Sequence, residues 1–414
     1  MKSATSRAFA ALALAAVVTS GCSSKAENTS TNTAGGVKTG PGIADGTIQL
    51  GVITDLSGAF APIGKELSQA AQIYWDDKNA QGGVCGQFPV ELEVRDSGYN
   101  VQNTVSLYSD MRQDVLGFPN LLGSAHTLAL KDSLAADDML VVTHGQGVEL
   151  LGIENVITTG ATFDIEGANG MGYLLETGKV KDGDTIGHIH MEGTYGDAVR
   201  DGVQEFAGAH DMTVKATQIA PTVTDLTPAI TDLAGEDVDM LVFSGSPPQL
   251  ASAVGAASAA GLDVPVLASS PTWTSSLLNT PAGDALKKNV TVVFAAAPFE
   301  VEAANTFRSL YVKAHPDEDP SLQIVLALSE MVAFDAVLEK ACADGDLTRA
   351  GVMEAKRTIG AVDTGVTPTL HFSDPAKPAT AKMFVTGVAD VPGGLKLIEP
   401  DYVSEEGQAL FDAK

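Results

Sequence analysis

Basic residues are scarce in this chain of 414 residues. Lys and Arg number 25 against 52 Asp and Glu, so the formal net charge at pH 7 is -27. A surface this acidic repels both the phosphate backbone of nucleic acids and anionic lipid headgroups, which excludes both as direct partners. The charge instead predicts a solvated acidic surface that keeps the protein soluble.

Aromatic residues are also few, at 6% of the chain, while 44% of the residues are hydrophobic and Gly alone numbers 42. Ala and Val supply much of the remaining apolar content. This composition is typical of a tightly packed α/β protein with many contacts between helices and sheet. The length exceeds what one ordinary core accommodates and is ample for two lobes.

Catalytic signatures are missing as well. The sequence contains neither a Gly-x-Ser-x-Gly elbow nor a phosphate-binding loop. GANGMG (167–172) falls within a predicted helix rather than after a strand, so it is not a dinucleotide fingerprint. His188 and His190 share a strand face without an evident third metal ligand. Asp55, Asp96 and Asp164 form no evident acid pair, so we expect no enzyme activity, metal or cofactor.

Long apolar runs are limited to FAALALAAVV (9–18), which follows a positively charged start and is too short to remain as a membrane-spanning helix. Small residues then lead to Cys22. This arrangement resembles a bacterial lipoprotein signal, with residues 1–21 removed and Cys22 lipidated. An ordinary secretory signal cut nearby is the alternative, and it also exports the protein. Residues 22–46 are rich in Ser, Thr, Asn and Gly and predict a flexible tether.

Two further cysteines remain, Cys85 and Cys342. Because an exported protein meets an oxidising compartment, we expect them to form a disulfide. Two buried free thiols are the alternative.

Strand-like and helix-like segments alternate from residue 47 onward, and the alternation begins again near residue 161. Such alternation predicts parallel sheets with right-handed crossovers. The expected strands include 47–56, 89–97, 139–145, 185–191, 238–245 and 289–298, and the expected helices include 65–83, 101–114, 127–138, 161–178, 195–210, 305–316, 321–342 and 347–360. The segments that follow the strands are rich in Gly and Ser, which lets backbone N–H groups approach a small ligand.

Several stretches together resemble the type I periplasmic binding proteins, specifically the branched-chain amino acid group of ABC-transporter receptors. They are GVITDLSGAFAPIG (51–64), KNAQGGVCG (78–86), ELEVRDS (91–97), GTYGDAVRDG (193–202), TDLTPAITDLAGEDVDMLVFSG (224–245) and GVTPTLHFSD (365–374). No single motif is specific, whereas the ordered set covers about residues 47–400.

The resemblance implies two Rossmann-like lobes that close on a ligand like a hinged clam. It implies an N-terminal lobe of residues 47–160 and 298–365, and a C-terminal lobe of residues 161–297 and 366–414. Three crossover strands are expected near 158–162, 296–300 and 363–370.

The same resemblance places a ligand's carboxylate at Ser124, which opens a helix and whose hydroxyl and neighbouring N–H groups favour an anion. Ser124 can equally act as a helix cap, and the two roles are compatible. Ala125 lies beside it. Gly145 and Gly147 match the family's second contact with the carboxylate and amine of the ligand. His144 stands where a Pro is usual in the family. Gln146 either reaches the ligand or faces solvent.

Tyr195 matches the family's cleft tyrosine, and Ser246 stands where a ligand-facing tyrosine occurs. Ser270 stands where a Glu pairs with the ligand's α-ammonium. An unpaired ammonium in a dry cleft costs several kcal/mol, so either another acid substitutes or the ligand has no ammonium. Trp273 is expected equally to cover the ligand or to pack within its lobe, and Phe60 completes the candidate set.

The function implied is that of an exported, lipid-anchored receptor of an ABC importer, working as a monomer with permease subunits. We expect a small ligand that carries a carboxylate or an amide, resembling a branched-chain amino acid but without an obligatory amine. Urea, short amides and aromatic acids are alternative ligands. A sensor that uses the same cleft is the alternative role.

Overall fold

The computed structural model describes residues 32–414. The predicted signal peptide, Cys22 and the first part of the predicted tether lie outside the described residues. Within the described part of the chain, no helix is both long and apolar enough to cross a membrane.

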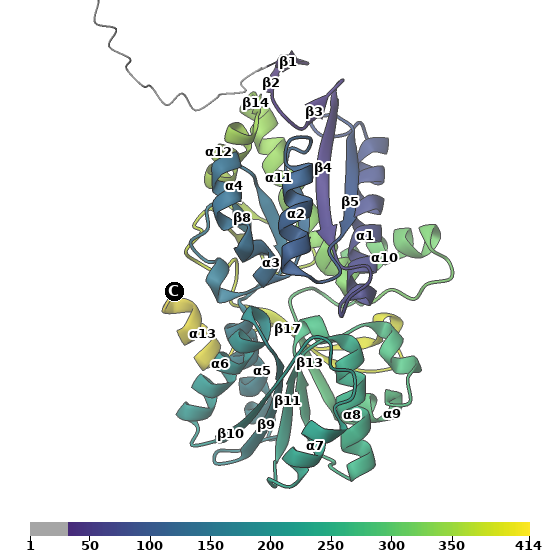
Figure 1. Cartoon of the computed structure of the whole chain (residues 1–414), viewed down its shortest axis with the longest axis vertical. Coiled ribbons are helices and arrows are strands. Elements are labelled where there is room, and N and C mark those ends of the chain that lie inside the picture. The colour runs from purple at the N-terminus through teal and green to yellow at the C-terminus, as the bar shows by residue number, and fades with distance from the viewer. Residues whose placement is uncertain (1–31) are drawn as a thin grey trace, which may run out of the picture. The chain divides into compact units, whose positions relative to one another are not determined.

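The first sheet forms the centre of the N-terminal lobe (Figure 1). Its strand order is β3-β4-β6-β7-β8, and β5 pairs with the free edge of β4. All pairings are parallel except that of β3 with β4. The bounds are β3 Ile43–Ala44, β4 Thr47–Thr54, β5 Val90–Asp96, β6 Phe118–Leu122, β7 Val141–His144 and β8 Val156–Ile157.

Helices cover both faces of this sheet, which explains why its strands read as nearly continuous apolar runs. In β4, Leu50 packs under α1 and α11, whereas Ile53 packs under α2 and α4. The helices of this lobe are α1 Ala61–Ala80, α2 Val101–Met111, α3 Ser124–Ala129, α4 Lys131–Asp137, the short η1 Val148–Leu150, α10 Glu302–Ala314, α11 Gln323–Ala343 and α12 Arg349–Thr358.

A disulfide joins Cys85, just after α1, to Cys342, in the last turn of α11. The two Cα atoms lie 6.2 Å apart, and 257 positions of sequence separate them. Both side chains pack against the same core as α1 and α11, so the bridge fastens two neighbouring helices of one lobe.

The second sheet forms the centre of the C-terminal lobe, with strand order β10-β9-β11-β12-β13-β17-β18. The first five strands are parallel, and β17 and β18 are added antiparallel at one edge. The strands are β9 Thr185–Met191, β10 Thr213–Ile219, β11 Met240–Ser244, β12 Val266–Ala268, β13 Val290–Phe294, β17 Met383–Val388 and β18 Leu395–Tyr402.

Two groups of helices flank the second sheet. Figure 1 shows α5, α6 and α13 together on one side and α7, α8 and α9 together on the other. Their bounds, with those of three short helices, are α5 Phe163–Glu176, α6 Thr194–Ala209, α7 Thr227–Ala234, α8 Pro247–Ala260, η2 Ser270–Thr272, η3 Ser275–Asn279, α9 Gly283–Asn289, η4 Pro392–Gly394 and α13 Glu405–Asp412.

The chain passes between the lobes three times. The first passage lies between β8 and α5, and the second lies between β13 and α10, near the expected positions. The third lies later than 363–370. Strand β15 (Ala361–Val362) pairs with β16 (Leu370–His371), and Phe372 and Ala379 still pack in the N-terminal lobe core. The apolar side chains of the TLHF segment therefore hold it to the N-terminal lobe, and the expected boundary at 365/366 is too early.

Part of the predicted tether is folded. Strands β1 (Asn32–Ala34) and β2 (Val37–Thr39) form a hairpin, and β2 pairs in parallel with β14 (Asp346–Leu347). Val37 is buried in the N-terminal lobe core, so part of this polar segment has a folded partner that its composition did not reveal.

Other boundaries differ locally. Helix α1 begins four residues before the predicted start because Pro62 occupies its first turn, where a missing N–H costs nothing. The predicted helix 127–138 is two helices that meet at Leu130. Strand β18 and helix α13 were not anticipated.

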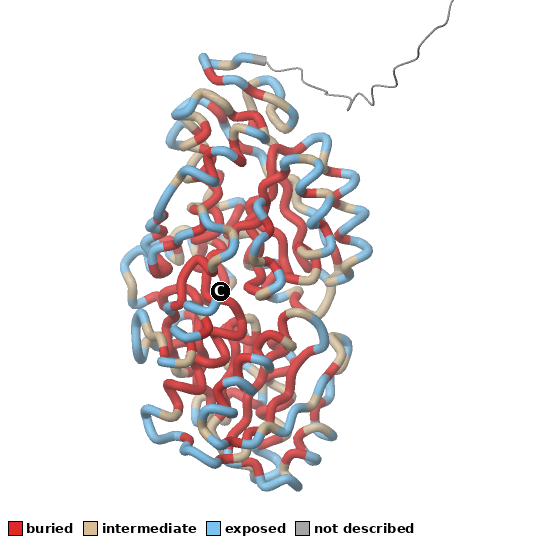
Figure 2. The backbone as a smooth tube through the Cα atoms, turned by 90° about the vertical axis from the view of Figure 1, so that its left-hand side faces the viewer, coloured by how far each residue is buried: buried red, intermediate tan, exposed pale blue. Residues whose placement is uncertain are grey.

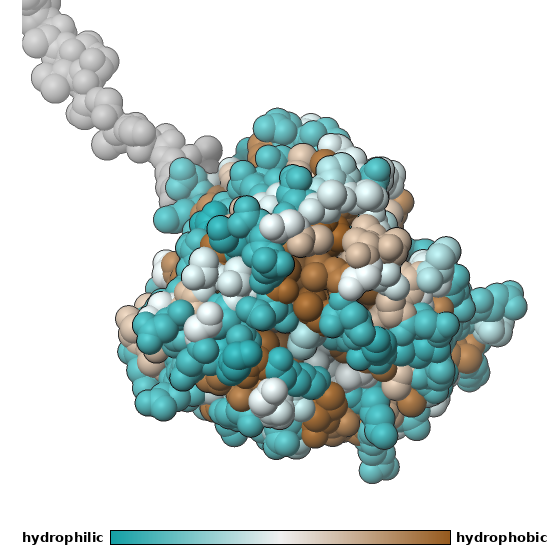
Figure 3. Space-filling view, turned by 90° about the horizontal axis from the view of Figure 1, so that it is seen from below, coloured by the Kyte–Doolittle hydropathy of each residue, from teal (hydrophilic) through white to brown (hydrophobic). Residues whose placement is uncertain are grey.

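Buried backbone runs through both sheets and through the region where the lobes meet (Figure 2). Seen from the end of the C-terminal lobe, the surface is largely hydrophilic, with apolar residues gathered in limited patches (Figure 3). Leu56, Val105 and Ile398 are the large hydrophobic side chains exposed among the described residues.

Candidate functional site

A cavity lies between the lobes, at the carboxyl ends of parallel strands from both sheets, where open α/β sheets bind ligands. Its space free of atoms is about 480 Å³, which includes space open to solvent, and the centre of a water-sized sphere can occupy only about 30 Å³ of it. The lining residues are Phe60, Ile63, Tyr99, Leu122, Gly123, Ser124, His144, Gly145, Gln146, Phe163, Tyr195, Ser270, Pro271, Gln323 and Leu326. None of these described lining residues is Asp, Glu, Lys or Arg.

Aromatic rings form much of the apolar wall. Ring centroids lie 4.5 Å apart for Phe60 and Tyr99, and 4.8 Å apart for Phe163 and Tyr195. Phe60 of the N-terminal lobe and Tyr195 of the C-terminal lobe approach edge to face at 6.4 Å. These rings therefore meet across the interlobe boundary, and both lobes present apolar surface to one enclosed space.

Ser124 begins α3 and fixes the loop opposite. Its Oγ accepts a hydrogen bond from the backbone N–H of Gly147 at 2.9 Å. A Cβ at position 145 would lie 2.6 Å from the Ser124 nitrogen, so only glycine permits this approach. Ser124 and Gly145 line the cavity as expected, whereas Gly147 does not, because its N–H supports Ser124 instead of facing the cavity.

His144 lines the same wall and was not among the candidate residues. Its Nδ1 lies 2.7 Å from Oε1 of Glu330, which is fully buried. Oε2 of Glu330 accepts a hydrogen bond from Asn120 at 2.5 Å. The imidazole is therefore held in one orientation by a carboxylate beneath the sheet. Only its position after a strand pointed to the cleft, and nothing in the sequence connected it to a glutamate on α11.

Tyr195 contributes its ring rather than its hydroxyl. The hydroxyl lies 2.5 Å from Ser269 Oγ and donates to the carbonyl of Gly245 at 3.3 Å. Burial raises the pKa of Tyr195 well above its usual range. The phenol thus stays neutral and bonded within its own lobe, while the ring lines the cavity.

Ser270 lines the cavity, and a carboxylate lies directly behind it. Glu166 of α5 accepts from the Ser270 backbone N–H and from its hydroxyl, each at 2.7 Å. Burial raises the pKa of Glu166 to about 7. An acidic side chain, Glu166, therefore lies near the cavity but does not line it. Both of its carboxylate oxygens accept hydrogen bonds from Ser270. No sequence motif indicated this pairing, which spans 104 positions.

Two glutamines face the cavity with incomplete hydrogen bonding. Gln146 is 3% exposed, and neither atom of its carboxamide has a hydrogen-bond partner within residues 32–414. Gln323, absent from the candidate set, bonds the C-terminal lobe through Nε2 but leaves Oε1 unpaired in the same range. Gln146 was expected either to reach the ligand or to face solvent, and the second expectation is wrong because the side chain is buried.

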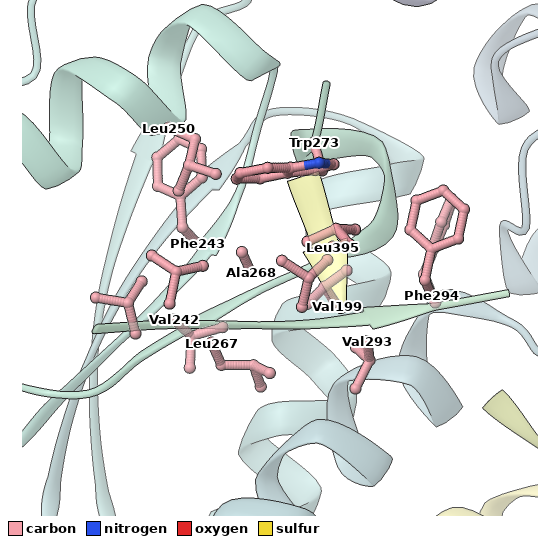
Figure 4. Packing of buried hydrophobic residues seen from close by; sticks show 14 of the residues in the cluster. Val199, Val242, Phe243, Leu250, Leu267, Ala268, Trp273, Val293, Phe294 and Leu395 are labelled. Carbon is pink, nitrogen blue, oxygen red and sulfur yellow. The ribbon is translucent and has the colours of Figure 1, made fainter. Parts of the chain in front are cut away.

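Three expected residues lie elsewhere. Ala125 does not line the cavity. Ser246 caps α8 in a reciprocal box with Gln249. Trp273 is fully buried, and its indole lies among Phe243, Leu250 and Leu395 in the C-terminal lobe core, with Nε1 donating to the carbonyl of Gly393 (Figure 4). Of its two expected roles, the structure shows packing within the lobe.

The two strand histidines do not form a metal site. His188 bonds Ser244 through Nε2 at 3.0 Å, and burial lowers its pKa to about 3. Within residues 32–414, no group of three or more His, Cys, Asp or Glu side chains is placed to hold a metal.

The site is that of a two-lobed solute receptor, and comparisons with known proteins agree. The family model described as periplasmic binding protein matches residues 47–392. The chain belongs to this family, the type I periplasmic binding proteins that serve as substrate-binding proteins of ABC transporters. The family is non-enzymatic, binds small molecules outside the cytoplasm and works with ABC-transporter permeases.

Individual relatives differ in their named ligands. A fatty acid ABC transporter substrate-binding protein from Thermomonospora curvata is 35% identical, with a TM-score of 0.87 over 90% of this chain and 96% of that chain. A branched-chain amino acid ABC transporter from Thermus thermophilus, with bound valine, is 14% identical, with a TM-score of 0.78 over 88% and 98%.

A Leu/Ile/Val-binding protein, BraC3, from Rhizobium johnstonii is 27% identical over 212 residues, which is 50% of this chain and 57% of that relative. The fold is therefore shared with solved structures whose named ligands are chemically distinct.

Proposed function

We propose that this protein captures a small ligand that carries a carboxylate or amide on an apolar body and needs no α-ammonium. The observation that carries the proposal is the cavity lining, which combines aromatic and aliphatic side chains with Ser, His and Gln and contains no acidic residue. An ammonium enclosed there would meet no acidic side chain, because Glu166 lies behind Ser270 and does not line the cavity.

The headgroup is assigned to the N-terminal lobe. Ser124 Oγ accepts from Gly147 and so keeps its own hydrogen available for a ligand oxygen. Gln146 offers a further amide donor beside it. The apolar body is assigned to the rings of Phe60, Tyr99 and Tyr195. The named fatty acid ligand of the 35% identical relative is in keeping with this assignment.

Capture is proposed to proceed by closure of the lobes. Because Phe60 and Tyr195 belong to different lobes, a ligand between them contacts both only when the lobes are together. Ligand therefore shifts the open–closed equilibrium by its differential affinity for the closed form. The closed receptor then delivers its ligand to the permease subunits.

Titration calorimetry on one carbon skeleton tests the ligand class. We expect 4-methylpentanoate or 4-methylpentanamide to bind at least about 100-fold more tightly than leucine, since a buried unpaired ammonium costs several kcal/mol. Urea and benzoate extend the panel to the alternative ligands. Leucine or valine binding more tightly than the amine-free analogues would refute the ligand class and leave the family assignment intact.

Anchoring through Cys22 is a separate part of the proposal. We expect the exported protein to incorporate labelled fatty acid and to fractionate with membranes, and Cys22→Ser to abolish both. Mass spectrometry of the mature N-terminus distinguishes a lipidated cysteine from an ordinary signal-peptidase cut. An unmodified N-terminus elsewhere would contradict the anchor.

A further inference from the structure

Gln323 connects the two lobes beside the cavity. It is the first residue of α11, whose helix packs against α1 and the sheet of the N-terminal lobe. Its Nε2 donates to the carbonyl oxygens of Ser270 at 3.0 Å and Trp273 at 3.1 Å, both in the C-terminal lobe. One amide nitrogen has two hydrogens, so these bonds use its donor capacity fully.

The orientation of this carboxamide is fixed by its partners. Turning it over would place Oε1 against two carbonyl oxygens, which are acceptors only. Oε1 is therefore the free end of the group. It is buried and has no hydrogen-bond partner within residues 32–414, and Gln323 is 1% exposed and lines the cavity. A buried acceptor left unpaired is costly, so a partner from the ligand is favoured.

The segment 270–273, whose carbonyl oxygens accept the hydrogen bonds from Gln323, is itself held in place by buried contacts. Glu166 bonds both the N–H and the hydroxyl of Ser270. Trp273 is fully buried and bonds Gly393. The two carbonyls are thus fixed points of the C-terminal lobe, and the Gln323 bonds to them join the two lobes in this structure.

We propose that Gln323 joins the two lobes through Nε2 and recognises an uncharged hydrogen-bond donor of the ligand through Oε1. We call this residue, with its two functions, the latch. A ligand O–H or amide N–H pairs with Oε1 while Nε2 holds Ser270 and Trp273. The inference rests on the proposed function and narrows its ligand class to carboxylates or amides that carry such a donor. A neutral amide oxygen suits a hydroxyl or amide N–H, whereas an ammonium also needs a counter-charge that the lining lacks.

The test uses four probes that share one skeleton: 4-methylpentanoate, its 2-hydroxy and 3-hydroxy derivatives, and 4-methylpentanamide. In calorimetry on the wild-type protein, at least one donor-bearing probe should bind about tenfold to hundredfold more tightly than 4-methylpentanoate, which leaves Oε1 unpaired. In Gln323→Met, which keeps the length of the side chain, this preference should fall below about threefold.

A matched control is available in Gln69. It lies on α1 of the same lobe, its amide is bonded to Glu318 and Tyr311, and it does not line the cavity. Gln69→Met should therefore keep the wild-type preference. Gln323→Glu separates the two halves of the latch, because it keeps an acceptor and loses the donors. A carboxylate oxygen then faces the carbonyl oxygens of Ser270 and Trp273, so the ligand-induced decrease in radius of gyration, measured by small-angle scattering, should shrink.

The outcomes are distinct. If 4-methylpentanoate binds but no donor-bearing probe binds more tightly, or if the preference survives in Gln323→Met, the latch is refuted and the proposed function stands. If leucine outranks every amine-free probe, the proposed function fails, and the inference fails with it. Should Gln323→Met not fold, the wild-type ranking and Gln323→Glu decide the question.

Discussion

The contact between Gly145 and Ser124 leaves no room for a side chain. A Cβ at 145 would lie 2.6 Å from the Ser124 nitrogen and 2.7 Å from its Oγ. We expect Gly145→Ala to displace either α3 or the loop that follows β7. The substitution should destabilise the protein by about 1–3 kcal/mol and weaken 4-methylpentanoate binding at least about tenfold. Thermal unfolding and calorimetry measure the two effects.

Gly208 provides the matched control. It lies on the exposed face of α6, and a Cβ there would meet nothing within 4 Å. Gly208→Ala should therefore stabilise the protein by about 0.5–1 kcal/mol and leave binding unchanged. Equal effects of the two substitutions on binding would contradict the role assigned to Gly145.

For single residues of the candidate site, the sequence predicted those that follow strands. It missed those whose place in the cavity depends on the tertiary fold. Ser124, Gly145 and Ser270 could be placed because strand ends of a parallel sheet meet at one edge. Gln323 could not, since it begins an apolar helix and meets its partners across about 50 positions. Trp273 had two physically equal roles, and only packing distinguished them.

The elements of the fold are joined by buried and half-buried carboxyl groups as well as by packing. Glu166 joins α5 to η2, and Glu66 joins α1 to the segment before α11 through Ser321. Burial raises the pKa of each from 4.5 to about 7. Each carboxyl therefore binds its proton more tightly in the folded protein than in the unfolded chain.

The stability that these protons supply is complete below about pH 4.5 and is lost as the pH rises through about 7. We expect the melting temperature of the wild type to fall between about pH 5 and pH 8, and the fall to shrink in Glu166→Gln and in Glu66→Gln. Glu205→Gln, on the exposed surface of α6, should keep the wild-type slope. A slope unchanged in both Glu166→Gln and Glu66→Gln would disprove the linkage.

The disulfide between the ends of α1 and α11 stabilises one lobe. We expect the double variant Cys85→Ala, Cys342→Ala to lose about 2–5 kcal/mol of unfolding free energy, because the unfolded chain is no longer constrained. Dithiothreitol should lower the denaturant midpoint of the wild type but leave that of the double variant where it is. A wild type insensitive to reductant would show that the bridge carries no stability.

The whole molecule carries a formal net charge of -27, and like charges repel one another in the compact state. Raising NaCl from about 10 mM to about 100 mM shortens the screening length from roughly 30 Å to roughly 10 Å. We therefore expect the melting temperature to rise over this range at constant pH. A fall, or no change, in a differential scanning measurement would count against charge repulsion as a limit on stability.

The two-lobed α/β architecture could be predicted from alternation and composition, because both follow from burying each sheet on two faces. The outlying strands could not. The β1–β2 hairpin is polar in composition and is ordered by its pairing with β14. Strand β18 is largely exposed, so it lacks the apolar pattern that marks a strand.

The N-terminal lobe is built from two separated parts of the chain, and this has a consequence for its synthesis. Its first five parallel strands are complete by Ile157, yet α11, which covers one face of their sheet, begins at Gln323. During translation, α11 is not yet available to cover that face while strands β9 to β13 are made. Cys85 likewise has no disulfide partner until Cys342 has been made. The lobe that begins first is thus finished late, and the apolar strands of its sheet stay without one covering helix until α11 has been made.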